Sequence, residues 1–192
     1  MPSHVRNRLM HITVEADVKV WASWAANRGI DPVLVAYNRY RAAEYHHKFS
    51  PADNAYPTPR TWAMSDQVLR LGLPSALEQE CLSGTVGAAA SADLAGFRRT
   101  CASLPDPDAI IADPDHYLLP EDPATLYALM GALAHRAKAG TFASIVRYLD
   151  RLPQQEFAVV CVLDATARDP ALMTTSSYQH WAAAKGDLLT NR

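Results

Sequence analysis

Apolar residues recur at helical spacing along most of this chain, and prolines stand where those patterns begin or end. The segments 126–133 and 142–149 each place apolar residues at positions i, i+3, i+4 and i+7, as an amphipathic helix requires. The chain has 33 alanines, the strongest helix formers, and only 8 glycines. Its 13 prolines lie at boundaries that a helical protein tolerates. The sequence therefore predicts a mainly α-helical, multi-helical bundle.

Capping residues locate the individual helices. Asp17, Asp31-Pro32 and Thr58-Pro59 each place an acceptor side chain before a helical pattern, two of them with proline at the first helical position. Residues 50–57 are expected to be a turn-rich linker, and residues 105–123, with five prolines and five aspartates, a surface connection with one helical turn. The other expected helices begin at Pro74, after Asp93, and over 126–133, 142–149, 157–163 and 178–188, which gives eight to ten in all.

One segment near the start departs from the helical pattern. His11 to Glu15 alternates polar and apolar residues and contains three β-branched side chains, which predicts a strand. A short helix is expected just before it, over residues 3–9, with Ser3 as its N-cap. A strand must pair with another, and no second strand is predicted in the chain.

Composition and charge exclude several classes of protein. A length of 192 residues corresponds to one domain, or to one small domain with an appendage. The 18 basic and 20 acidic side chains give a net charge of −2, which argues against nucleic acid or an anionic membrane as the main partner. Three cysteines without CxxC spacing are typical of a reducing compartment. With no signal-peptide pattern and no apolar run of about 20 residues, we expect a cytoplasmic protein.

The common catalytic and metal-binding motifs are absent from the sequence. It contains no G-x-x-x-x-G-K-[ST] phosphate loop, no G-x-G-x-x-G, no H-E-x-x-H and no G-x-S-x-G. His46 and His47 are adjacent and would point about 100° apart on a helix, so they are not expected to share a metal ion. Trp21 and Trp24, at helical spacing, are expected to be core residues.

Two arginines are candidates for binding an anion. Arg8 stands between the predicted short helix and the predicted strand, and Arg60 lies in the first turn of the helix that Thr58 caps. The helix dipole favours acids in the first turn, so a cation there either reaches for an anion or is merely solvated. The sequence by itself leaves both readings of Arg60 open.

Two segments resemble MoxR-type AAA+ ATPases. Residues 2–15, which read PSHVRNRLMHITVE, are similar to the segment before the last core strand of that family, and residues 57–62, PTPRTW, resemble the motif that opens a helix of its lid. The resemblance covers about a third of the chain. It implies that Arg8 is the arginine finger, which reaches into the nucleotide site of a neighbouring subunit, with Arg6 as the alternative. It implies that Arg60 is the sensor-2 arginine, which contacts the γ-phosphate.

The same resemblance implies how the chain is organised. Residues 1–16 would be a remnant of the ATPase core, 17–104 a lid-like region, 105–123 a connection and 124–192 a helical extension packed on the same core. The chain would be joined to an upstream ATPase core, and full-length subunits would assemble into a ring. ATP and Mg²⁺ would bind to the complete ATPase and are not expected to bind well to this chain alone. Its function would be chaperone-like, with a von Willebrand factor A domain protein as a candidate partner.

Two other functions are compatible with the sequence. The chain could be a stand-alone α-helical protein-interaction module without catalytic activity, in which the arginines are solvated. Alternatively it could be an enzyme with an unrecognised active site, which would require convergence of several among Asp66, Glu80, Tyr127 and His135.

Overall fold

The computed structural model describes residues 8–190, with side chains described as far as Lys185. This part of the chain is built from helices, which confirms the mainly α prediction, and none of them is long and apolar enough to cross a membrane. The helices are α2 (Val18–Asn27), α3 (Pro32–Tyr40), the π-helix η1 (Ala42–His46), α4 (Pro59–Arg70), α5 (Ser75–Val86), α6 (Ala88–Ala102), α7 (Pro107–Ala112), α8 (Pro123–Arg136), α9 (Phe142–Asp150), α10 (Gln155–Arg168), the 3-10 helix η2 (Pro170–Thr174) and α11 (Ser176–Thr190).

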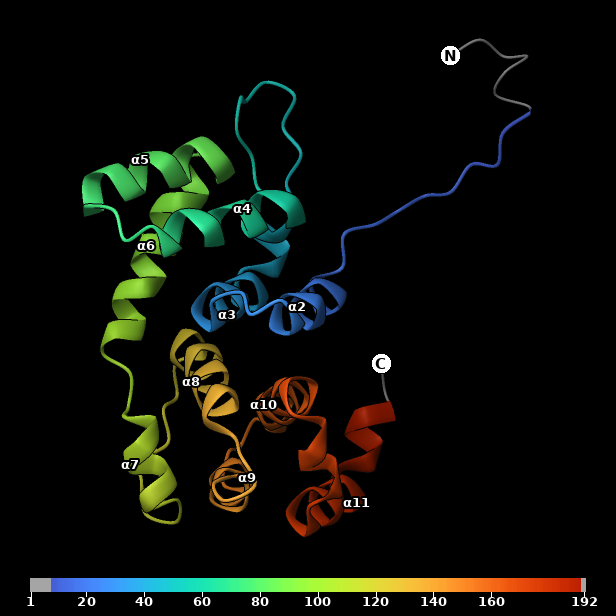
Figure 1. Ribbon diagram of the computed structural model, residues 1–192, viewed down its shortest axis with the longest axis vertical. Helices are drawn as coiled ribbons and strands as arrows, with labels where there is room; N and C mark the ends of the chain where they lie inside the picture. Colours follow the sequence, from blue (N-terminus) through green and yellow to red (C-terminus); the bar gives the residue numbers. More distant parts are fainter. Residues whose placement is uncertain (1–7, 191–192) are drawn as a thin grey trace.

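Two groups of buried apolar side chains form the core, and α8 contributes to both. The first lies among α2 to α6 around Trp62 and Tyr37, and the second among α7 to α11. Figure 1 shows α3 and α8 next to each other between the two groups. Gly131 faces α3 at this contact, where a Cβ would lie 3.4 Å from the carbonyl oxygen of Pro32, at the limit of ordinary van der Waals contact. The two groups are therefore in direct contact through α3 and α8.

Ion pairs fix α3 to helices that are distant in the sequence. Both terminal nitrogens of the Arg39 guanidinium contact the Asp164 carboxylate in α10, at 2.5 and 2.6 Å, and both side chains are largely buried. Arg41, just past α3, donates to Asp93 in α6, which also accepts from the Tyr37 hydroxyl at 3.0 Å. These pairings were not anticipated from the sequence.

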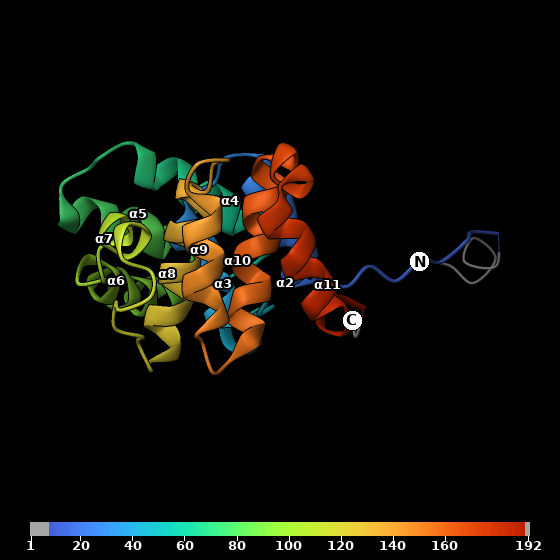
Figure 2. The same cartoon turned by 90° about the horizontal axis from the view of Figure 1, so that it is seen from below.

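The predicted strand at His11–Glu15 is not formed. Residues 9–16 are exposed and take no regular secondary structure, and no other strand occurs within residues 8–190 with which this segment could pair. The segment leaves the start of α2 as an extended arm that projects from the helical body (Figures 1 and 2). Met10, Ile12 and Val14 are 76–88% exposed on it, so its alternating pattern has no buried face.

Two local predictions were also wrong. Asp93 was expected to cap a helix, but it lies inside α6, where its carboxylate accepts from Arg41 and Tyr37. The helix instead begins at Ala88 after Gly87, whose φ of +85° suits glycine and whose Cβ would lie 2.8 Å from the Ala55 carbonyl oxygen. Trp24 was expected in the core and is 43% exposed, whereas Trp21 is buried as expected.

Candidate anion site at the start of α4

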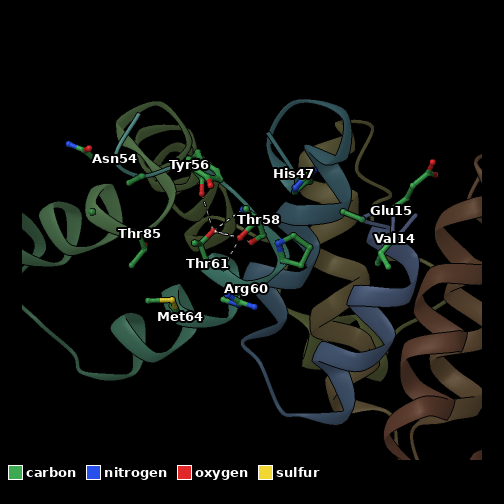
Figure 3. Close-up of a pocket in the computed structure, with 14 residues that line it drawn as sticks. Val14, Glu15, His47, Asn54, Tyr56, Thr58, Arg60, Thr61, Met64 and Thr85 are labelled. Atoms are coloured by element: carbon green, nitrogen blue, oxygen red, sulfur yellow. Dashed lines mark hydrogen bonds between the residues drawn. The ribbon is translucent and has the colours of Figure 1, made fainter. Parts of the chain in front are cut away.

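An open hollow of about 640 Å³ lies at the first turn of α4. The arm, the segment between η1 and α4, α4 itself and the end of α5 all contribute to its wall. In Figure 3, Arg60 lies at the start of α4, with Val14 and Glu15 on one side of the hollow and Thr85 on the other. The lining residues are Val14, Glu15, Ala16, His47, Asn54, Ala55, Tyr56, Thr58, Pro59, Arg60, Thr61, Met64, Gly84 and Thr85.

A capping box determines where α4 begins and hence where Arg60 lies. The backbone N–H of Thr61 donates to the Thr58 hydroxyl oxygen at 3.1 Å, and the backbone N–H of Thr58 donates to the Thr61 hydroxyl oxygen at 2.8 Å. Pro59 takes the first helical position, where its missing N–H costs nothing. This local sequence places Arg60 at the second position of the helix, as predicted.

Arg60 has no protein partner in the part of the chain that the structure describes. Its side chain is exposed and takes part in no hydrogen bond or ion pair there, and the first turn of α4 contains no acidic residue. The guanidinium is permanently charged, and the helix N-terminus adds partial positive charge beside it. Glu15 is the acidic residue in the wall of the hollow, and it lies on the arm. The start of α4 can therefore receive an anion.

Tryptophan and aspartate side chains attach α4 to its neighbours. The indole N–H of Trp21 in α2 donates to the Pro59 carbonyl at 3.0 Å, and that of Trp62 donates to the Tyr45 carbonyl at 2.8 Å. The buried Asp66 carboxylate accepts from the Asp31 N–H at 2.8 Å, so it links α4 to the start of α3. The first turn of α4 thus rests on a fixed support.

The burial of a histidine close to this support was not predicted from the sequence. His46, 3% exposed, ends the π-helix η1, and its Nδ1 lies 3.0 Å from Asn38 Oδ1. The Asn38 amide nitrogen donates to the Leu34 carbonyl, so Oδ1 is the acceptor and His46 Nδ1 carries the proton. His46 Nε2 is buried with no hydrogen-bond partner within the described residues. No sequence motif marks such a pair, because it depends on the π-helical turn.

We expect stability to fall as the pH is lowered through this histidine's titration. Burial of His46, with a smaller effect of nearby His47, lowers its pKa below the usual 6.5. The unfolded chain therefore binds more protons just below pH 6.5, which makes the folded state less stable with decreasing pH, by at most about 1.4 kcal/mol per pH unit for one proton.

Urea unfolding between pH 7.5 and 5 measures this effect, and His46→Gln should reduce the slope. His135→Gln is the comparison variant. Partial burial and nearby arginines also lower the pKa of His135, so this variant separates its share of the pH dependence from that of His46. A slope that His46→Gln leaves unchanged would contradict the assignment to His46.

The structure does not bring Arg8 to the same hollow. Arg8 is exposed on the arm, and Arg6 lies outside the described residues. The four residues considered for an unrecognised active site do not converge either. Asp66 is paired with Arg70, Glu80 is exposed, and no hydrogen bond or ion pair joins any two among Asp66, Glu80, Tyr127 and His135 within residues 8–185.

Comparisons with protein-family models, with curated proteins and with solved structures find no match. Across the described residues, no group of three or more His, Cys, Asp or Glu side chains is placed to hold a metal ion. The inference about function therefore rests on the hollow, its arginine and the arm.

Proposed function

We propose that this chain is the C-terminal lid region of a MoxR-like AAA+ ATPase, in which Arg60 contacts the γ-phosphate of ATP as sensor 2. The observation that carries the proposal is the Arg60 guanidinium, which has no partner among the described residues and lies in an open hollow, at a helix start without acidic residues. The capped first turn, to which Trp21 donates a hydrogen bond, holds Arg60 at the wall of this hollow.

The arm supports the same proposal. Ile12 and Val14 are 76% and 88% exposed on an extended segment, which is a costly arrangement unless these side chains pack elsewhere. In the complete ATPase the arm would be the last strand of the core sheet, and its apolar side chains would be buried there. Arg8 would then be held at the edge of that core, where it faces the neighbouring subunit as the arginine finger.

The residues of this chain suit only part of a nucleotide site. Arg60 can bind phosphate oxygens through its forked donors, and its backbone N–H, at the helix start, has no hydrogen-bond partner within the described residues. Ligands for Mg²⁺ and a phosphate loop would come from an upstream core. We further propose a cytoplasmic ring of such subunits with a chaperone-like role, and a von Willebrand factor A domain protein as partner.

Arg60 can be tested in this chain by titration with tripolyphosphate. We expect the backbone amide signals of Arg60 and Thr61 to shift with a weak, salt-sensitive affinity, and Arg60→Ala to reduce that affinity at least about tenfold, as the loss of a charge-assisted hydrogen bond predicts. Arg99→Ala is a matched control, because Arg99 is exposed near the end of α6 and has no ion pair in the described chain.

An Arg60→Ala variant that binds tripolyphosphate like the unaltered chain would overturn the proposal. So would a gene in which no in-frame G-x-x-x-x-G-K-[ST] coding sequence precedes these residues.

A stand-alone helical interaction module is the second candidate function. It is favoured by the outer face of α2, where Val20 and Trp24, one turn apart, are 69% and 43% exposed. This candidate predicts that Arg60→Ala leaves tripolyphosphate titrations unchanged, whereas Trp24→Ser abolishes binding to a protein partner. The same titration therefore separates the two functions.

A further inference from the structure

One hydrogen bond connects α2 to the peptide unit that contains the Arg60 nitrogen. The Trp21 indole N–H donates to the Pro59 carbonyl oxygen at 3.0 Å, between residues 38 positions apart. Trp21 is 6% exposed, so the bond is largely shielded from water. The Pro59 carbonyl and the Arg60 N–H belong to one planar peptide group and point in opposite directions. Holding the carbonyl therefore fixes the direction of the Arg60 N–H.

The Trp21 ring is itself held in place. The His46 ring meets it edge-on, with centroids 5.5 Å apart and planes at 62°, and Asn38 fixes the His46 ring through Nδ1. A chain of buried contacts therefore runs from Asn38 in α3 to His46 in η1 and then to Trp21. Trp21 in turn holds the Pro59–Arg60 peptide group. Pro59 adds rigidity, because its ring restricts φ at the same position.

We propose that Trp21 is a positioning residue for Arg60, which sets the angle at which the Arg60 N–H and guanidinium together meet a polyphosphate. The inference rests on the proposed function and deepens it. Trp21 does not touch the anion, because its indole lies on the α2 side of the Pro59–Arg60 peptide and the free N–H of Arg60 faces the other way. Trp21 contributes by restricting the backbone conformation of the first turn of α4 before the anion binds.

Trp21→Phe is the decisive variant, because it keeps an aromatic ring in the core and removes the N–H donor. We expect the affinity for tripolyphosphate, read from the Arg60 and Thr61 amide signals, to fall by about three- to tenfold, the range for one hydrogen bond. Tyr148→Phe is the matched control. It removes the buried hydroxyl that donates to the Leu118 carbonyl at 3.1 Å in the second core group, and it should leave the titration unchanged.

A second measurement uses the unaltered chain and applies even if Trp21→Phe fails to fold. The Trp21 indole N–H signal should shift with the same midpoint as the Arg60 amide during the titration, whereas the indole signal of Trp181, in the other core group, should not move. An unmoved Trp21 signal, or a Trp21→Phe variant with unchanged affinity, would overturn the inference. If Arg60→Ala also had no effect, the proposed function itself would fail, so the two failures are distinguishable.

Discussion

Under the proposed function, Arg8→Ala in the complete ATPase is expected to abolish hydrolysis, with a loss of about 10³–10⁵-fold in turnover, while nucleotide binding stays nearly intact. The reason is that a finger arginine stabilises charge that develops on the transferred phosphoryl group, and that charge is absent from the bound ground state. Arg8 is exposed on the arm outside the hollow of Arg60, which leaves it accessible to the neighbouring subunit that the proposed function requires. Turnover and nucleotide affinity, measured separately, check this result.

Two further experiments test whether Arg8 or Arg6 is the arginine finger and whether it acts on a neighbouring subunit. Arg6→Ala should have a small effect if Arg8 is the finger, and a larger effect than Arg8→Ala if the alternative is correct. Subunits with Arg8→Ala should also regain activity when mixed with subunits that lack the phosphate-loop lysine, because each supplies what the other lacks. Normal turnover in Arg8→Ala would rule out its assignment.

The helices could be predicted because their signals are local. The Thr58-Pro59 start of α4 needs only residues within one turn, since the capping box joins positions 58 and 61. The same holds for Asp17, whose carboxylate accepts from the N–H groups of Lys19 and Val20 at the start of α2. The position of Arg60 followed from these rules, although its lack of a partner required the structure.

The features that the sequence did not reveal depend on distant residues. The Trp21 bond to Pro59 and the Arg39 contact with Asp164 join positions 38 and 125 residues apart. Asp93 fits a helix cap by its chemistry, but inside α6 its carboxylate accepts from Arg41 and from the Tyr37 hydroxyl, which lie more than 50 positions away. The strand expected at His11 to Glu15 fails for a related reason, since a strand is completed by a partner and not by its own alternation.

Arg39→Ala is expected to have the largest effect on stability, about 3–5 kcal/mol of the free energy of unfolding. The side chains of Arg39 and Asp164 are 15% and 11% exposed, so the substitution leaves a carboxylate largely buried without its partner. Because the pair joins α3 to α10, the substitution should mainly weaken the packing between the two core groups. Urea unfolding measures the change, and amide exchange should increase more in α10 than in α5.

The expected loss comes from a buried charge left without its partner, and two further variants test this explanation. Replacing both partners with apolar residues of similar size, as in Arg39→Met with Asp164→Leu, should restore stability to within about 1 kcal/mol, since no buried charge remains. Arg147→Ala removes an ion pair with Asp115 whose side chains are 58% and 52% exposed, and it should cost less than about 1 kcal/mol. If Arg39→Ala cost no more than Arg147→Ala, the ion pair would not be what joins the two core groups, and the packing of α2 on α10 and of α3 and α6 on α8 would have to join them instead.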